Sequence, residues 1–459
     1  MSGSLFARTL GSAAMGEVFG DRALVAGMLS FEAALAEAEA DEGVIPRQAV
    51  AAIVAACSAA FDVDELVHEA RVAGSLAIPL VRRLTARVAE VDAQAAGYVH
   101  WGSTSQDVID TAMVLATRRA LELVDADLDR LCAALAALAR AHLETPMLAR
   151  TLLQPAQVIS VGFKLVAWVA PLSRARDRLA RARRRALTLQ FGGAVGTLAS
   201  LAEKGPAVAR RIADRLGLAP AAGAWHTQRD AWVALACDVA VLCGSLGKIG
   251  HDLALLAQAE VGEMAEPAGI GRGGSSAMPN KRNPVAAMTA IAAAARTPHH
   301  AGALLAAMGQ EHERSLGRWQ AELAEWPSLF IATHGALAAL ADAAEGLEVD
   351  SVRMRANIDA QRGAVFAEAA ATVLARSIGK SRAHALVAAW SKTLAGSADA
   401  DLAALARAAL REDAALATVD AAALDAAFDI DAAARRAGSL ARAQLDALQR
   451  APSSAGDPS

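Results

Sequence analysis

Apolar residues recur at helical spacing along most of this chain of 459 residues. Between Ser103 and Thr145 there is no glycine or proline, and leucines and alanines follow one another three, four or seven positions apart. This pattern predicts one long helix, and about 35 helical residues would span roughly 50 Å.

Further apolar runs of helical period follow in the middle of the chain. They extend from residue 155 to about 185, from 228 to about 264, onward from 284, and from 318 to 344. Pro171 is expected to kink or break the first of these, and its arginines at 174–185 are expected to form a solvated helix face. Together with the first helix, these runs predict a bundle of five long helices. Residues 197–220 are expected to form an irregular connection between bundle helices.

The chain is longer than a single hydrophobic core usually organises. We therefore expect an N-terminal helical domain over residues 1–110, a central bundle over 111–355, and a C-terminal helical domain over 356–459. The last residues, 451–459, are rich in proline, serine and glycine and are expected to be disordered.

Small residues lie on more than one face of the predicted bundle helices. Gly244, Gly247 and Gly250 mark one such helix. Helices of this kind can pack closely on several sides and would be over-exposed in a monomer. The pattern therefore predicts that the bundle associates with other copies of itself.

Composition supports an all-α fold. The chain is 54% hydrophobic but only 4% aromatic, so its apolar content lies in small helix-forming residues. The 45 basic and 49 acidic residues are intermixed and give a formal net charge of -4, which offers no broad positive surface for nucleic acid.

No feature of the sequence predicts a membrane segment or a secreted protein. The N-terminus lacks the pattern of a signal peptide, and charges such as Lys164 and Asp238 are expected to interrupt every apolar run before it reaches membrane-span length. The four cysteines show neither a CxxC pair nor zinc-ligand spacing, so we expect reduced core thiols in a soluble, cytoplasmic protein.

Residues 271–284 carry the most informative motif, Gly-Arg-Gly-Gly-Ser-Ser-Ala-Met-Pro-Asn-Lys-Arg-Asn-Pro. A glycine-rich segment runs into paired hydroxyls, then a lysine and an asparagine, and ends on a proline suited to the first turn of a helix. Loop N–H groups could stabilise an alkoxide at Ser275 or Ser276, while Lys281 and Asn283 offer a charge and a donor to a developing enediolate. An ordinary linker would explain only the glycines.

Two more segments fit the same chemistry. Residues 100–107, His-Trp-Gly-Ser-Thr-Ser-Gln-Asp, precede the first long helix, where hydroxyls and N–H groups can bind a carboxylate. Taken alone, this block is more simply a capping box with Ser103 or Thr104 as the cap. Residues 150–155, Arg-Thr-Leu-Leu-Gln-Pro, form a turn. The glycine-rich loop is itself the third segment, and Glu311-His-Glu-Arg-Ser315 follows it after one helix.

These blocks resemble, in order and separation, the three signature blocks of the fumarase/aspartase superfamily, and the resemblance covers essentially the whole chain. It implies a three-domain all-α fold, a homotetramer with composite active sites, a small polycarboxylate substrate, and no metal or organic cofactor. It also implies that Ser275 transfers a proton beside a substrate carboxylate and that Lys281 and Asn283 stabilise the intermediate. The remaining residues implied to bind substrate are His100, Thr104, Ser105, Gln106, Gln154 and Arg314. For His100 the sequence leaves open whether it contacts substrate or only positions the loop.

The finer pattern resembles the 3-carboxy-cis,cis-muconate cycloisomerases, which act in protocatechuate (β-ketoadipate) catabolism. The resemblance rests on 31–36, 77–81, 100–107, 225–230 and 310–313. Many superfamily lyases have histidine where this chain has Leu152. In those lyases the histidine assists the departure of an amine. A carboxylate, with a pKa near 4, needs no general acid. The leucine therefore favours an intramolecular cycloisomerase over the alternative, an adenylosuccinate or other N-substituted succinate lyase that releases fumarate.

Other features point in different directions. The adenylosuccinate lyases usually carry a His-Asp pair where this chain has Arg-Val-Ala-Gly at 71–74, whereas Asn280, where related sequences often have histidine, leaves the substrate open. His299, His300 and His312 do not form a recognisable metal-ligand set. A catalytically dead structural bundle would be expected only if Ser275 or Lys281 had been lost.

Overall fold

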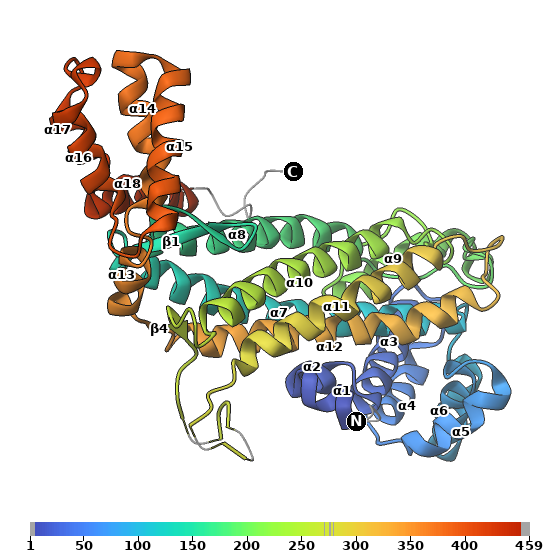
Figure 1. Cartoon of the computed structure of the whole chain (residues 1–459). Coiled ribbons are helices and arrows are strands. Elements are labelled where there is room, and N and C mark those ends of the chain that lie inside the picture. The colour runs from blue at the N-terminus through green and yellow to red at the C-terminus, as the bar shows by residue number, and fades with distance from the viewer. Residues whose placement is uncertain (1–4, 270, 275–276, 279, 451–459) are drawn as a thin grey trace.

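The computed structural model describes residues 5–269, 271–274, 277–278 and 280–450, and over these residues the chain is largely helical (Figure 1). The expected all-α class is confirmed. Regular strands in this part of the chain form two short antiparallel pairs. These are β1 (Pro146–Thr151) with β2 (Gln154–Ser160), and β3 (Met264–Ala265) with β4 (Glu348–Val349).

Short and medium-length helices precede the bundle. They are α1 (Leu5–Leu10), α2 (Ala13–Val18), α3 (Asp21–Asp41), α4 (Arg47–Cys57), α5 (Val63–Ala73), α6 (Ala77–Val91) and the 3-10 turn η1 (Ala95–Tyr98). Their apolar side chains share a core with residues that come much later in the chain. Phe31 of α3 is completely buried, and its ring centre lies 6.2 Å from that of Phe191.

Long helices run side by side through the middle of the molecule (Figure 1). They are α7 (Ser105–Ala141), α8 (Val161–Ala186), α10 (Asp230–Leu256), α11 (Val285–Ala306) and α12 (Arg318–Ala344). Each predicted long run contains one of these helices, so the bundle is confirmed. With 37 residues, α7 is about 55 Å long.

Aromatic stacking joins the bundle helices in their common core. The rings of Trp232 (α10) and Trp326 (α12) are nearly parallel, with centres 3.8 Å apart, and Trp326 is completely buried. The indole N–H of Trp326 donates to the hydroxyl of Thr117 on α7 at 2.8 Å. A buried indole needs such a partner for its N–H, so this contact fixes the three helices relative to one another.

Helix α7 begins within the first polar block. Thr104 is its N-cap, and the Asp107 carboxylate accepts a hydrogen bond from the Thr104 N–H at 3.2 Å, as in a capping box. The predicted cap is confirmed, with Thr104 in that role.

The prediction of a helix starting near Pro155 is wrong for its first residues. The chain there forms β2, paired with β1 through a two-residue turn in which Leu152 and Leu153 have φ of 51° and 65°. Two left-handed residues are what a tight hairpin needs, but glycine usually supplies them, so the sequence carries no turn signal. Helix α8 starts only at Val161 and continues through Pro171 without ending there.

The expectation of an irregular connection over residues 197–220 is also wrong. The segment contains the 3-10 stretch η2 (Ala199–Lys204) and the helix α9 (Gly205–Leu216), which ends at Gly217 with φ of 62°. The amphipathic pattern of α9 is short, but Val208 and Ile212 are completely buried against the N-terminal helices.

Helix α10 contradicts the expectation that charge interrupts every apolar run before membrane-span length. Its length and composition alone would allow it to cross a bilayer, with a mean hydropathy of 1.6 over 18 residues. However, 56% of that window is buried inside the protein, as in the core helix of a bundle. Gly247 and Gly250 face α11, where the backbone oxygen of Ala287 would lie 2.9 Å from a Cβ added at Gly250.

The C-terminal part is again made of shorter helices. They are α13 (Ser351–Asp359), η3 (Ala364–Phe366), α14 (Ala367–Ile378), α15 (Lys380–Gly396), α16 (Leu402–Glu412), η4 (Ala414–Leu416), α17 (Ala421–Ala426) and α18 (Ile430–Arg450). Helices α14 to α17 enclose a separate apolar core, whereas α18 returns to the bundle, where Leu445 is buried. The domain boundaries at residues 110 and 355 stay predictions, and residues 451–459 lie outside the described part.

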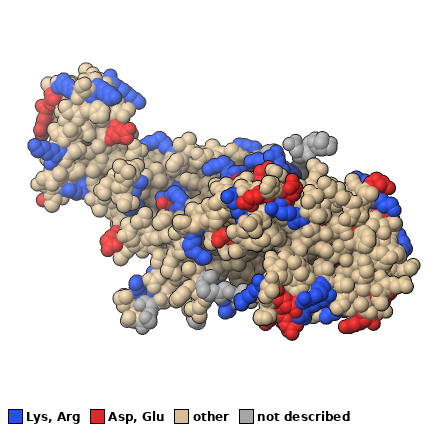
Figure 2. Space-filling model, turned by 90° about the vertical axis from the view of Figure 1, so that its right-hand side faces the viewer, with Lys and Arg blue, Asp and Glu red and all other residues tan. Residues whose placement is uncertain are grey.

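Basic and acidic side chains are interspersed on the face shown in Figure 2, with broad uncharged areas between them. The distribution follows the intermixed charges of the sequence.

We expect Gly247→Ala to destabilise the protein by about 1–3 kcal/mol, because overpacking forces neighbouring helices apart. An added Cβ would lie 2.3 Å from the Cβ of Ala294 on α11. The matched control is Gly244→Ala on the same helix, where no described atom outside the adjoining turns of that helix lies within 4 Å of the added Cβ. This control should be neutral or slightly stabilising. Chemical denaturation of both variants tests the packing, and equal effects would contradict it.

Candidate active site

A cluster of polar residues surrounds the start of α7. The Gln106 side chain is buried, and its amide nitrogen donates to Asp110 at 3.1 Å and to the carbonyl of His226 at 2.8 Å. Its amide oxygen accepts from Arg314 at 3.0 Å. Because both ends of the amide are used within the chain, Gln106 is placed to orient Arg314. Ser105, the first residue of α7, is partly exposed beside it.

Arg314 comes from the segment before α12, more than 200 positions after Gln106 in the chain. Its second terminal nitrogen donates to the carbonyl of Gly193 at 3.1 Å, while its buried Nε has no hydrogen-bond partner among the described residues. Burial lowers the pKa of Arg314, against the opposing effect of Asp107 and Asp110. The side-chain oxygen of Ser103 is likewise buried without a partner in the described structure. Unpartnered buried polar groups are costly unless a ligand satisfies them.

His100 lies on the same end of the bundle and is held by an acid from α3. Its Nδ1 is 2.6 Å from an oxygen of Glu32, whose side chain is 1% exposed. Burial opposes protonation of His100, but Glu32 and Asp107 outweigh it and raise the pKa of the imidazole. His100 also has a left-handed backbone, with φ of 60°.

Asp107 organises the backbone of this cluster. Its carboxylate accepts hydrogen bonds from the N–H groups of Gly192 (3.1 Å) and Gly193 (2.9 Å), and it lies 2.7 Å from Nε2 of His226. In the sequence, residues 225–230 were noted only as part of a family resemblance. The pairing of His226 with Asp107, more than 100 positions away, was not predicted. The signal that could have indicated a buried partner is Asp107 itself, an ionisable residue on the buried face of α7.

The glycine-rich loop returns on itself before α11. The N–H of Asn283 donates to the carbonyl of Gly273 at 2.8 Å, and its side-chain amide donates to the carbonyl of Gly274 at 3.2 Å. Gly273 has φ of 62°, and a Cβ there would lie 2.6 Å from the Asn283 oxygen, so the turn requires glycine. Lys281 is exposed beside it. Ser275, the predicted proton-transfer residue, lies outside the described residues.

Both ends of the loop are tied to the bundle. Arg282 pairs with Glu348 of β4 at 2.8 Å. The Glu266 carboxylate accepts from the N–H groups of Ala286 (3.0 Å) and Ala287 (2.8 Å), and so caps the positive end of α11. A cavity of about 650 Å³ lies at the loop, lined in part by Lys281 and Asn283.

The Arg-Thr-Leu-Leu-Gln block forms the tip of the β1–β2 hairpin. Leu152 is 97% exposed and Gln154 is exposed beside it. The strand next to the turn is anchored, because Arg150 makes a two-pronged ion pair with Glu263 at 2.7 and 2.9 Å. Leu152 therefore lines no pocket among the described residues of its own chain.

The predicted site residues fall into two groups within one chain. His100, Thr104, Ser105, Gln106 and Arg314 gather at the start of α7. Gln154 lies in the hairpin that follows the far end of that helix, which is about 55 Å long, and the loop with Lys281 and Asn283 emerges beside β4 at that end of the bundle (Figure 1). A single chain does not bring the two groups together.

Histidines elsewhere do not form a metal site in the described residues, where no group of three or more His, Cys, Asp or Glu side chains could hold an ion. His300 lies 2.6 Å from Glu325. His312 contributes only its carbonyl, which accepts from the Thr227 hydroxyl at 3.0 Å.

Comparison with known proteins identifies the family of this chain. The family model described as lyase matches residues 9–297, more than half of the chain. This chain belongs to the lyase family. The predicted membership of the fumarase/aspartase superfamily is thereby confirmed.

Relatives of this chain include enzymes of two activities. A 3-carboxy-cis,cis-muconate cycloisomerase of Bradyrhizobium diazoefficiens is 53% identical over 389 residues, covering 84% of this chain and 86% of that protein. A nitrosuccinate lyase of Streptomyces davaonensis is 44% identical over 376 residues, covering 80% and 79%. The crystal structure of the 3-carboxy-cis,cis-muconate lactonizing enzyme from Pseudomonas putida matches with a TM-score of 0.90 at 42% identity, covering 98% of this chain and 99% of that one.

We expect Glu32→Gln to lower the pKa of His100, because a neutral amide cannot stabilise the imidazolium. A raised folded-state pKa means that the pair stabilises the protein fully below the unfolded value of about 6.5 and loses this contribution as pH rises through the folded value. The free energy of unfolding should therefore differ more between wild type and variant at pH 5.5 than at pH 9.

Isotope-labelled histidine and NMR titration would measure this shift directly. The internal control is His142, whose pKa is lowered by burial and whose Nδ1 lies 3.1 Å from the Thr145 hydroxyl. Its titration should not change. An unaltered titration of His100 would show that Glu32 does not control its charge.

Proposed function

We propose that this protein is a cytoplasmic 3-carboxy-cis,cis-muconate cycloisomerase that forms 4-carboxymuconolactone in protocatechuate catabolism. The observation that carries the proposal is that this one activity is named for the 53% identical relative and for the solved structure that matches nearly the whole chain. The motif residues described above supply the chemistry that the reaction needs.

Substrate binding relies on the cluster at the start of α7. Arg314, with its unpartnered Nε, takes one substrate carboxylate, and Thr104 and Ser105 contribute hydroxyls. Gln106 acts by holding Arg314, since its own amide is fully engaged. Gln154 contributes from the hairpin tip. His100, held in place by Glu32, presents its imidazole near this end.

The reaction adds one substrate carboxylate to the conjugated double bond. A C–O bond forms, and the electron pair of the alkene moves onto the carbon beside another carboxylate, giving an enediolate-like intermediate. Lys281 and Asn283 stabilise its charge, and Ser275 delivers the proton that completes the lactone. The nucleophile is a carboxylate and needs no general base, in keeping with Leu152 where other lyases carry histidine. No step calls for a metal or organic cofactor.

The active enzyme is a homotetramer whose sites combine segments from different chains. This part of the proposal is motivated by the separation of the two residue groups along α7. It is supported by exposed apolar side chains on the bundle, among them Val241 on α10, Met288 on α11 and Leu305 on α11, which are 53%, 54% and 52% exposed in the single chain.

A second candidate is elimination from a substituted succinate to release fumarate. It is favoured by the nitrosuccinate lyase, whose identity of 44% is close to the 43% of a cycloisomerase from Acinetobacter baylyi. The alternative suggested by the sequence is of this kind: an adenylosuccinate or other N-substituted succinate lyase.

An ultraviolet assay on two substrates separates these functions. With 3-carboxy-cis,cis-muconate, we expect loss of diene absorbance without a second product. With nitrosuccinate or adenylosuccinate, we expect no fumarate. If fumarate release is the faster of the two reactions, the protein is a lyase and the cycloisomerase proposal is wrong.

Ser275→Ala should lower turnover about 10²-fold or more, which is the usual scale for losing a proton-transfer group. Ser276→Ala is the matched control.

Mixing two inactive variants tests the composite site. One chain carries Ser275→Ala, and the other carries Thr104→Ala with Ser105→Ala. After subunit exchange, some sites should receive an intact residue group from each parent, so part of the activity should return. A mixture of each variant with itself is the control. No recovery, with exchange verified by mass spectrometry, would mean that each site is built from one chain.

A further inference from the structure

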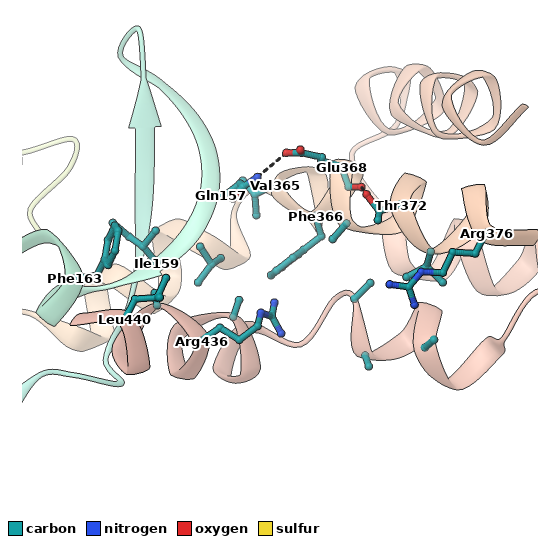
Figure 3. Close-up of a pocket in the computed structure, with 18 residues that line it drawn as sticks. Gln157, Ile159, Phe163, Val365, Phe366, Glu368, Thr372, Arg376, Arg436 and Leu440 are labelled. Carbon is teal, nitrogen blue, oxygen red and sulfur yellow. Dashed lines mark hydrogen bonds between the residues drawn. The ribbon is translucent and has the colours of Figure 1, made fainter. Parts of the chain in front are cut away.

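A cavity of about 820 Å³ lies between the hairpin, the start of α8 and the C-terminal helices (Figure 3). None of the predicted site residues lines it. One wall is β2 with Gln157 and Ile159, and the others come from α8, η3, α14, α17 and α18. Its size is within the range of pockets that hold small molecules.

Much of the cavity surface is apolar. Phe163, Val365, Phe366 and Leu440 contribute aromatic and aliphatic side chains from separate elements, and Ile159 adds another from the strand. Phe366 is itself braced by Phe428, whose ring centre lies 6.0 Å away in an edge-to-face arrangement. A surface of this kind suits the flat face of an aromatic ring.

Two arginines supply the charge. Arg376 on α14 and Arg436 on α18 both line the cavity, and neither forms an ion pair or hydrogen bond in the described structure. By contrast, Arg407 and Arg355 on neighbouring helices are each paired with an aspartate. Two guanidinium groups beside an apolar wall offer directed donors to a carboxylate.

Two acids, Glu368 and Asp429, lie near these arginines. Glu368 on the cavity wall accepts a hydrogen bond from the Gln157 amide at 2.6 Å. Asp429, close to Arg436, accepts from the Ala432 N–H at 2.9 Å and lies 3.8 Å from Arg435. The hydrogen bond from a neutral amide leaves the charge of Glu368 in place, and Asp429 is shared electrostatically between Arg435 and Arg436. Among the side chains that line the cavity, two arginines outnumber one acid, so the lining is net positive.

We propose that this cavity binds a small aromatic carboxylate, with the ring against Phe163 and Phe366 and the carboxylate at Arg376 and Arg436. The site is distinct from the proposed active site. Its wall is β2, the strand that begins at Gln154, and the Gln157–Glu368 hydrogen bond joins that strand to α14. An occupant thus bridges the C-terminal helices to the hairpin whose tip carries a proposed substrate-binding residue.

Hydrogen exchange with terephthalate as the probe tests the binding without using turnover, so the result does not depend on the proposed reaction. In wild type, we expect slower exchange in peptides covering residues 365–376 and 433–440. The double variant Arg376→Gln, Arg436→Gln should lose this protection, with affinity lowered about tenfold or more. The lysine double variant should retain part of it.

Arg442→Gln is the matched control, because Arg442 is exposed on the same helix as Arg436 and does not line the cavity. It should preserve the protection. The dication p-xylylenediamine, of similar size and opposite charge, should give none. Protection that persists in the double glutamine variant, that appears only around residues 100–106 and 281–283, or that is absent in wild type at millimolar terephthalate would overturn the proposal.

Discussion

The end of the bundle that carries the α7 cluster depends on one buried cation. Arg229 is 2% exposed and lies between Asp110 of α7, at 2.9 Å, and Glu322 of α12, with which it also pairs. Its guanidinium carbon is 4.4 Å from the centre of the Trp225 ring. Such burial is tolerated only because every charged group has partners, and removing one partner of a buried pair typically costs about 3–5 kcal/mol. Arg229 therefore fixes three segments that are distant in sequence.

The polar network around Asp110 extends this constraint to the site. Trp319 donates to the carboxylate at 2.9 Å, Gln190 at 3.2 Å and Gln106 at 3.1 Å. Because Gln106 also holds Arg314, the position of a proposed substrate-binding cation is coupled to a fully buried charge cluster. Rigid support of this kind lowers the entropy that binding would otherwise cost.

The sequence predicted the long helices well, because their apolar period is sustained over many turns and nothing competes with it. It failed at the hairpin, where Leu152 and Leu153 take a conformation that their residue types do not signal. The site motifs were visible as clusters of polar residues. Their supports were not, since the partners of Asp107 and Asp110 outside α7 and its cap lie roughly 80 to 210 positions away, and only the fold brings them together. Ser275 keeps its role as a proposal.

The hairpin tip has a consequence for how the protein holds together. Left-handed backbone at two bulky residues costs of order 1–3 kcal/mol each, and Leu152 and Leu153 are also 97% and 71% exposed in the single chain. An isolated chain would carry both the strain and the uncovered apolar surface. If other copies cover this tip, mass action links folding to association, and the melting temperature rises with protein concentration. The turn would then make dilution itself a destabilising condition.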